Sequence, residues 1–190
     1  SNFYLDIAKD RLYVSAPADQ RRRSCQTVMA LIIERLAGLI APVLCHMAED
    51  IWLNLPYPVE EDSVFQRGWP SGPDEWRDTS LVEPVQQLRL LRASVNRVME
   101  GCRSRQELGA SLEAAVRIDA PQPTLQAALD WLRDHGDRDV DGLRDWLLVS
   151  QLQLGGEPWA EVLASEQDDN ALIEVARARG IKCERCWHYE

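Results

Sequence analysis

The stretch that decides the fold is residues 81–102, which read LVEPVQQLRLLRASVNRVMEGC. Its apolar side chains recur every three or four positions, which is the spacing of one face of an α-helix. The stripe consists of Leu81, Val85, Leu88, Leu91, Val95, Val98 and Cys102. Because most of a helix's stability in a protein comes from packing its apolar face, this segment predicts one long helix of a packed helical domain.

Further helical patterns precede this segment. We expect helices over residues 3–13, from Asp19 to about residue 40, and over residues 43–55, with Pro42 interrupting the last two. Asp19 is placed to cap the second of these helices. Several long helices in succession favour an antiparallel helical bundle, which we assign to residues 1–108.

A long irregular connection separates the third helix from the fourth. Residues 56–80 contain four prolines and two glycines, which break regular structure. They also hold four aromatic side chains, Tyr57, Phe65, Trp69 and Trp76. A connection this aromatic is expected to pack onto the helices rather than extend into solvent.

The sequence changes character after Gly109. Alternating apolar and polar residues, the pattern of half-buried strands, replace the helical spacing in several places. We expect strands over residues 111–119, 147–154, 159–163 and 172–176, and a helix over residues 124–135. The predicted fold is therefore mainly α, an antiparallel helical bundle followed by a small α/β subdomain over residues 109–190.

Composition excludes several classes of protein. Of the 190 residues, 45% are hydrophobic and 27% are charged, as in ordinary globular proteins and unlike disordered or collagen-like chains. The net charge is −10, of which residues 1–105 carry −1 and residues 106–190 carry −9. Proteins that coat nucleic acid are usually basic, so any nucleic-acid contact here must be local and shape-specific.

The sequence indicates neither a membrane nor a secretory route. No apolar run approaches the roughly 18 residues that a membrane span needs. The N-terminal residues lack the basic patch and apolar stretch of a signal peptide. Five cysteines, an odd number, suit a reducing compartment. We therefore expect a cytoplasmic protein without a membrane partner.

Cys183 and Cys186 form a Cys-x-x-Cys pair. Thiolates at this spacing on a tight turn can both reach one zinc ion, but a structural zinc site needs four ligands. His188 is a third candidate, and a redox pair or two ordinary cysteines are alternatives. Because the chain stops four residues after Cys186, we interpret the pair as half of a severed zinc knuckle. We expect the fragment by itself to bind zinc poorly.

Arg185 and Trp187 flank the second cysteine. A guanidinium and an indole on a rigid knuckle suit stacking on unpaired RNA bases and bonding to their edges. The residues alone support equally well that Trp187 packs beneath the knuckle and Arg185 is solvated.

Two other basic groups occur in the sequence. One is Arg21, Arg22 and Arg23, and the other consists of Arg89, Arg92, Arg97, Arg103 and Arg105. A solvated helix face is the more ordinary explanation, and a phosphate-tracking surface is the alternative.

Catalytic signatures are absent from the sequence. It contains no dinucleotide-binding glycine motif, no phosphate-binding loop and no nucleophile-elbow motif. The three histidines, His46, His135 and His188, are far apart. The residues alone therefore favour binding over catalysis.

Several segments carry a resemblance in a fixed order. They are residues 3–13, 23–28, Leu-Ile-Ala-Pro-Val-Leu at 39–44, Ala-Glu-Asp-Ile-Trp at 48–52, 69–70, 109–114, and Lys-Cys-Glu-Arg-Cys-Trp-His-Tyr at 182–189. Together they resemble the C-terminal anticodon-binding region of bacterial-type isoleucyl-tRNA synthetases, a class I family, over essentially the whole chain. The segment 182–189 is the most specific.

The resemblance implies an enzyme that activates isoleucine with ATP and transfers it to tRNA-Ile. The family's ATP-binding catalytic domain lies upstream, and neither its two signatures nor its editing domain occurs here, so we expect no catalysis by this fragment alone. The implied partners are the anticodon loop of tRNA-Ile and the rest of the synthetase chain.

The resemblance also implies that Cys183 and Cys186 are the first two of four zinc ligands in the full-length parent. It implies that Arg185 and Trp187 meet the anticodon. We keep Arg21, Arg22 and Arg23 as further candidate tRNA-binding residues, from their charge.

Two hypotheses from other classes stand beside this one. The first is a free-standing helical interaction module whose acidic C-terminal half binds a basic protein. The second is a small zinc- or thiol-dependent enzyme, which is disfavoured because no base or third ligand is evident beside the cysteine pair.

Overall fold

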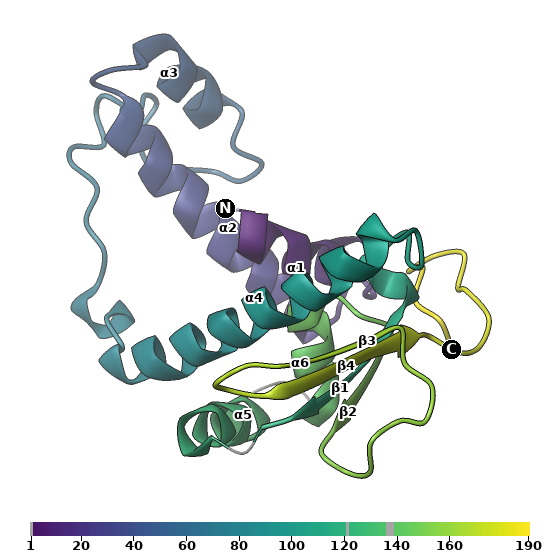
Figure 1. Ribbon diagram of the computed structural model, residues 1–190. Helices are drawn as coiled ribbons and strands as arrows, with labels where there is room; N and C mark the ends of the chain where they lie inside the picture. Colours follow the sequence, from purple (N-terminus) through teal and green to yellow (C-terminus); the bar gives the residue numbers. More distant parts are fainter. Residues whose placement is uncertain (1, 121, 136–138) are drawn as a thin grey trace. The chain divides into compact units, whose positions relative to one another are not determined.

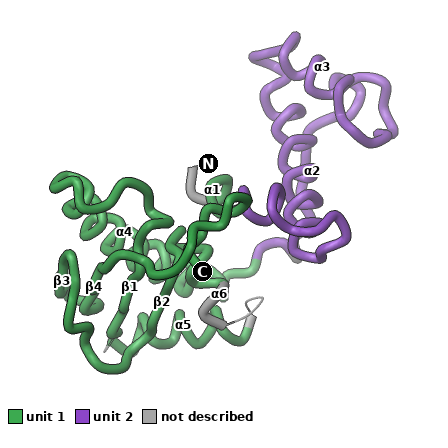
Figure 2. The backbone as a smooth tube through the Cα atoms, turned by 90° about the vertical axis from the view of Figure 1, so that its right-hand side faces the viewer, with its two compact units in different colours: residues 1–7, 78–190 green, residues 8–77 purple. Residues whose placement is uncertain are grey.

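The computed structural model describes residues 2–120, 122–135 and 139–190 (Figure 1). The chain forms two compact units (Figure 2). We call residues 8–77 the helical unit, and residues 1–7 with 78–190 the sheet unit. Within the described ranges, no helix is both long and apolar enough to cross a membrane.

The helical unit is built on α2 (Gln20–Ile40) and α3 (Cys45–Leu53). It also includes the second half of α1 (Asn2–Tyr13), whose first half belongs to the sheet unit. Asp19 caps α2 as predicted, because its carboxylate accepts hydrogen bonds from the backbone N–H groups of Arg21 and Arg22 at 2.8 and 3.2 Å. The two helices enclose a small core of Ala37, Ala41, Ala48, Trp52 and Val64.

The connection after α3 packs on the helices only in part. The hydroxyl of Tyr57 donates to the carbonyl of Ala30 at 3.0 Å, which confirms the expectation for this residue. Phe65, Trp69 and Trp76 instead keep more than half of their surface exposed. Trp76 lies in a 3₁₀ turn, η1 (Asp74–Trp76), and the guanidinium of Arg35 sits 4.7 Å from its ring centroid.

The sheet unit contains the remaining elements. They are η2 (Thr79–Leu81), α4 (Val82–Ser104), η3 (Ser111–Glu113), β1 (Ala114–Asp119), α5 (Pro123–His135), α6 (Asp139–Leu147), β2 (Gln151–Leu154), β3 (Ala164–Gln167) and β4 (Leu172–Arg177). The strands form one mixed sheet in the order β2-β1-β4-β3. β1 pairs with β2 in parallel and with β4 antiparallel, and β3 pairs with β4 antiparallel.

The predicted stripe of α4 becomes the centre of the sheet unit's core. Its members from Leu88 to Cys102 are buried, together with Val116 and Ile118 of β1 and Val175 of β4. α4 contacts α5, β3 and β4. The predicted boundary at 108/109 therefore does not coincide with the division into units, because α4 is part of the core that covers the sheet. The arrangement of all the helices as one antiparallel bundle stays a prediction.

Several local predictions in the second half differ from the structure. The strand expected over residues 111–119 begins at Ala114, because residues 111–113 form η3. The helix α6 was not expected, and Leu147 ends this helix instead of beginning a strand, since Leu143 and Leu147 face the core one turn apart. Residues 159–163 form a loop rather than a strand, because the backbone N–H of Trp159 donates to the carboxylate of Glu174 instead of to a neighbouring strand. The strand expected over residues 159–163 instead forms directly after that loop, as β3.

Candidate nucleic-acid interface

Residues 181–190 form a tight hairpin after β4. Lys182 and Tyr189 pair across it, and the backbone N–H of Cys183 donates to the carbonyl of His188 at 2.8 Å. The turn is closed by the N–H of Trp187, which donates to the carbonyl of Cys183 at 2.9 Å. We call this segment the C-terminal hairpin.

A glycine makes the entry to this hairpin possible. Gly180 has φ +107°, in a region that side chains disfavour. A Cβ atom placed there would lie 2.2 Å from the backbone oxygen of Glu190. The close approach of the hairpin's two ends therefore requires glycine at position 180.

Side chains at the start of β2 anchor the hairpin to the sheet. The hydroxyl of Ser150 accepts a hydrogen bond from the backbone N–H of Tyr189 at 2.9 Å. The amide of Gln151 bonds both backbone groups of Arg179, donating to its carbonyl at 2.7 Å and accepting from its N–H at 3.1 Å. These bonds fix the hairpin against the edge of the sheet where β1 and β2 begin and β4 ends.

The two cysteines lie together in the turn. Hydrogen bonds from the backbone N–H groups of Cys186 and Arg185, and from the thiol of Cys186, lower the pKa of the Cys183 thiol. Burial raises the pKa of the Cys186 thiol. N–H groups directed at sulfur suit a metal-binding thiolate, so the pair fits two positions of a four-ligand zinc site.

A complete ligand set is not assembled here. Across the described ranges, no three His, Cys, Asp or Glu side chains are grouped so that they could hold a metal ion. His188, the candidate third ligand, is a buried residue of the hairpin. The residues present therefore fit half of a zinc site.

Trp187 presents its indole to solvent. The side chain is 62% exposed, so it does not pack beneath the hairpin. Its backbone has φ +65°, a conformation that costs a non-glycine residue about 1–2 kcal/mol. The ammonium group of Lys182 lies 5.7 Å from the ring centroid. Arg185 is also exposed, and among the described residues it forms no ion pair. The hairpin thus offers an aromatic face and a guanidinium on either side of Cys186 in the sequence.

The three N-terminal arginines belong to the other unit. Arg21, Arg22 and Arg23 form the first turn of α2. The guanidinium of Arg22 donates to the carbonyl of Ser15 at 3.1 Å, and Arg23 is exposed. The structure therefore places this group in the helical unit and Arg185 with Trp187 in the sheet unit.

The arginines of α4 and Arg105, which directly follows it, mostly hold the sheet unit together. Arg92 donates to the carbonyl of Trp146 at 2.6 Å, and burial lowers the pKa of its guanidinium. Arg97 pairs with Glu166 at 2.8 Å and with Asp168 at 3.3 Å. Arg103 pairs with Glu100, and Arg105 pairs with Glu107 at 2.8 Å. These four are structural contacts rather than a row of charges open to phosphate.

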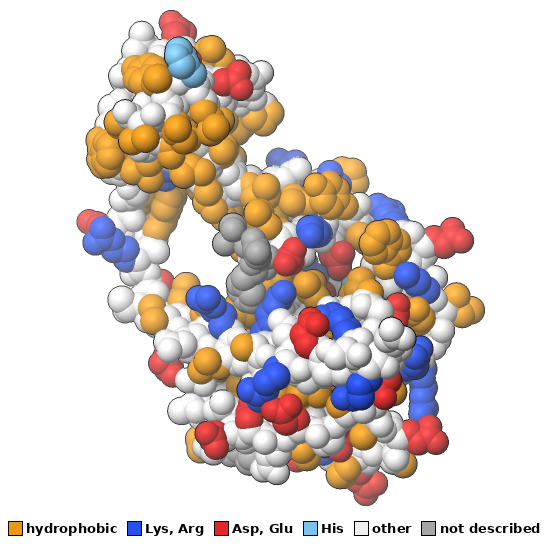
Figure 3. Space-filling model, turned by 45° about the horizontal axis from the view of Figure 1, so that its top comes forward, with side chains coloured by type: hydrophobic (Ala, Val, Ile, Leu, Met, Phe, Trp, Pro, Cys, Tyr) orange, Lys and Arg blue, Asp and Glu red, His pale blue; other side chains and the backbone are white. Residues whose placement is uncertain are grey.

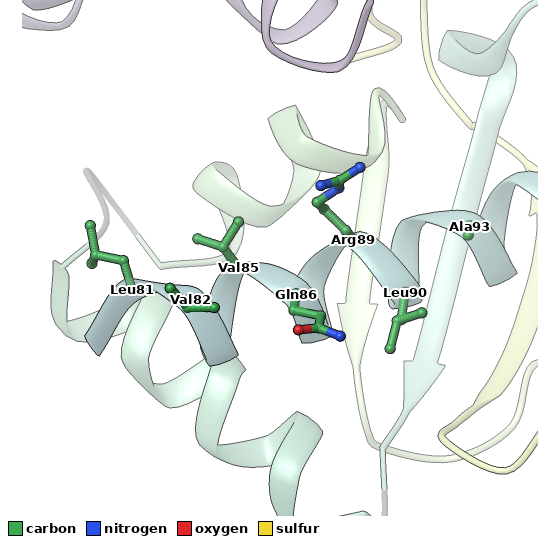
Figure 4. Close-up of a pocket in the computed structure, with 7 residues that line it drawn as sticks. All are labelled: Leu81, Val82, Val85, Gln86, Arg89, Leu90 and Ala93. Atoms are coloured by element: carbon green, nitrogen blue, oxygen red, sulfur yellow. The ribbon is translucent and has the colours of Figure 1, made fainter. Parts of the chain in front are cut away.

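The fifth arginine of this group, Arg89, borders an open depression on α4 (Figure 4). All of its lining residues come from η2 and one stretch of α4, and most are apolar. In Figure 4, Val85 and Arg89 point to one side of the helix while Gln86 and Leu90 point to the other. The depression is thus an uncovered helix surface without a cluster of polar groups.

Apolar and charged surfaces are distributed differently over the two units. On the face drawn in Figure 3, apolar side chains gather over the helical unit, while charged side chains of both signs cover the sheet unit. The exposed apolar residues of α2 include Val28, Ile32, Leu36 and Leu39.

Sequence reasoning missed a basic cluster around the hairpin. Residues 106–190 contain eight basic residues, and four of them lie between residues 175 and 189, where Glu184 is the only acid. They are Arg177, Arg179, Lys182 and Arg185. A local count of charge in this acidic half would have found them.

The first 118 residues match the family model described as the anticodon-binding domain of tRNA ligase. The chain belongs to this family, which confirms the resemblance.

Curated relatives of the chain include proteins named isoleucine–tRNA ligase. Those of Parasynechococcus marenigrum (strain WH8102), Prochlorococcus marinus (strain MIT 9313) and Synechococcus sp. (strain CC9311) are 82%, 74% and 73% identical over all of this chain. The chain spans about 20% of the length of these relatives.

Proposed function

We propose that this chain is the part of a cytoplasmic isoleucine–tRNA ligase that recognises the anticodon loop of tRNA-Ile. The observation that carries the proposal is the C-terminal hairpin, which is anchored to the sheet and exposes Arg185 and Trp187. The whole enzyme would join isoleucine to tRNA-Ile at the expense of ATP. ATP would bind in a catalytic region outside this chain.

Recognition would use the indole and the guanidinium in different ways. An unpaired base can stack on the exposed surface of Trp187, which is worth about 1–3 kcal/mol per base. Arg185 can donate two parallel hydrogen bonds to a base edge or a phosphate. The strained backbone of Trp187 supports this assignment, because strain of this kind concentrates at binding sites.

The acidic charge of the C-terminal half is compatible with this function. One loop of the tRNA would be read here while the remainder of the enzyme holds the rest, so only the contact surface must be basic. Binding energy from the anticodon would orient the distant acceptor end for the reaction.

Cys183 and Cys186 would hold a zinc ion in the full-length protein, together with two further ligands outside this chain. Zinc supplies a rigid closure of the turn that carries Arg185 and Trp187. In that protein α1, α2, α3 and α4 would form the predicted antiparallel bundle, and the rest of the synthetase chain would be its neighbour. Arg21, Arg22 and Arg23 would add contacts to the tRNA backbone.

The test is to replace Arg185 and Trp187 singly with Ala in the full-length protein. We expect charging of tRNA-Ile to fall about tenfold or more for each variant, since each loses an interaction worth at least about 1.4 kcal/mol. Isoleucine-dependent pyrophosphate exchange with ATP, which needs no tRNA, should be unchanged. Arg133→Ala, an exposed arginine on α5 that pairs with Asp130, is the matched control. Equal loss of charging and exchange would refute the assignment.

A further inference from the structure

The outer face of the sheet, opposite the core, carries a buried ion pair. Arg117 on β1 lies between Gln153 on β2 and Glu174 on β4 in the strand register. Its side chain is 1% exposed and pairs with the carboxylate of Glu174 at 3.0 Å. It also donates to the carbonyls of Gly155 and Gly156. This row of three side chains thus holds the start of the loop between β2 and β3.

The same row fixes Trp159 over the sheet. The backbone N–H of Trp159 donates to the carboxylate of Glu174 at 3.2 Å. Its indole N–H donates to the side-chain oxygen of Gln153 at 2.8 Å. The loop is therefore held by a desolvated charge pair and two further hydrogen bonds, which fix the side chain of Trp159 in one orientation on the sheet.

The next row toward the hairpin contains small side chains. Ala115 on β1 is paired with Gln151 on one side and with Ala176 on the other. Because the two alanines end at Cβ, the surface is recessed between Trp159 and the end of β4. The result is a pocket of about 430 Å³, within the size range of small-ligand sites.

Arginines line the side of the pocket nearest the hairpin. Arg177 and Arg179 are both exposed, and within the part of the chain that the structure describes neither guanidinium forms an ion pair. Glu161, on the Trp159 loop, is the acidic residue that lines the pocket. The pocket thus combines the indole of Trp159, a base formed by two alanines, and two guanidinium groups without ion-pair partners. This combination suits a ligand in which a phosphate is joined to a planar ring.

The pocket adjoins the segment that leads into the C-terminal hairpin. Arg179, which lines the pocket, is bonded through its backbone to Gln151 and is followed directly by Gly180 and the hairpin. A strand of RNA engaged by Arg185 and Trp187 would therefore pass close to the pocket.

We propose that this pocket binds one unpaired nucleotide of the same tRNA loop, next to the bases engaged by the hairpin. Arg177 and Arg179 hold its phosphate, and its sugar and base lie on the alanine floor against Trp159. This inference rests on the proposed function, and it assigns to the sheet a contact that the hairpin alone does not provide.

The test is made in the full-length protein with a tRNA-Ile transcript, whose Kd is measured over a series of salt concentrations. The double variant Arg177→Gln/Arg179→Gln should bind about tenfold more weakly at low salt. The slope of log K against log salt should fall by about 0.7 for each phosphate that the variant no longer binds. Ala176→Leu, which fills the floor without changing charge, should weaken binding but leave that slope unchanged.

Two single variants test whether the change in tRNA affinity follows the charge of the pocket. Glu161→Gln removes the acid of the pocket and should tighten binding about twofold to threefold by removing repulsion. Arg133→Gln, an exposed arginine on α5, should change nothing. Damage to the fold would weaken tRNA binding in every pocket variant. It could not make Arg177→Gln/Arg179→Gln bind more weakly and Glu161→Gln bind more tightly.

The outcomes separate this inference from the proposed function. If Trp187→Ala weakens tRNA binding while Arg177→Gln/Arg179→Gln and Ala176→Leu leave Kd and salt slope unchanged, the pocket proposal is wrong and anticodon recognition by the hairpin stands. If neither the hairpin variant nor the pocket variants alter tRNA binding, both are wrong. Weaker binding by the double variant with a smaller salt slope supports the pocket.

Discussion

Two sets of arginines in the sheet unit differ in what surrounds them. Three of those on α4, Arg92, Arg97 and Arg103, are engaged by carboxylates or carbonyls. Those at the end of β4 and just after it, Arg177 and Arg179, are exposed and form no ion pair among the described residues. The sequence shows both sets as basic clusters, so it is the acceptors brought by the fold that separate structural arginines from candidates for binding phosphate.

Arg117 is the extreme case of an arginine used for structure, and removing it should have the largest effect. Arg117→Met leaves the carboxylate of Glu174 buried without its charged partner and removes a hydrogen-bond donor from the carbonyls of Gly155 and Gly156. We expect a loss of about 3–5 kcal/mol in the free energy of unfolding. Urea unfolding of the 190-residue chain, followed by tryptophan fluorescence, measures this loss.

A double variant controls for the removal of the arginine side chain itself. Arg117→Met/Glu174→Leu removes both charges, so no ion is left buried, and most of the stability should return. A single variant as stable as the parent chain would show that the ion pair does not hold the face of the sheet.

The contrast between Arg117 and Arg177 shows how far sequence reasoning reaches. The stripe of α4 and the cysteine turn were predicted correctly as elements, because periodicity and short spacing are local properties. Strand register is not local, so the row of Gln153, Arg117 and Glu174 could not be read from the chain. Its neighbouring row of small residues, which makes the pocket, was hidden for the same reason.

The missed elements have similar causes. α6 is short, and its apolar residues run directly into the apolar start of the segment expected to be a strand. The loop at 159–163 has the composition of a strand, but the carboxylate of Glu174 takes the N–H of Trp159. Tertiary contacts decided both cases against the local pattern.

An intermediate effect is expected where α4 meets the turn between β3 and β4. Burial raises the pKa of Asp168. Hydrogen bonds from the hydroxyl of Ser94 and from the backbone N–H groups of Asn170 and Ala171 lower it, as does the positive charge of Arg97. The lowering effects outweigh burial, so the pKa of Asp168 lies below its ordinary value of 3.8. A depressed carboxyl pKa stabilises the fold above the unfolded pKa. This contribution should disappear as pH falls from above 3.8 through the lower pKa of the folded state.

The measurement is the free energy of unfolding in urea as a function of pH. Asp168→Asn should be less stable than the parent chain near neutral pH, and the difference should narrow as the solution is acidified. Asp169→Asn, at the exposed neighbouring residue, is the matched control and should follow the parent chain at every pH. A difference that stays constant down to low pH would show that the charge of Asp168 does not stabilise this contact.

The smallest effect on stability is expected for the arginines proposed to bind RNA. Measuring it tests directly the distinction between structural and RNA-binding arginines. Arg177→Gln and Arg179→Gln should change the free energy of unfolding by no more than about 0.5 kcal/mol, because exposed side chains without ion pairs contribute little to folding. Arg117→Met should instead cost several kcal/mol in the same urea titration. A loss above about 1 kcal/mol in either exposed variant would place that arginine with the structural set, and weaker tRNA binding by that variant would then be explained by the fold instead of by a missing bond to phosphate.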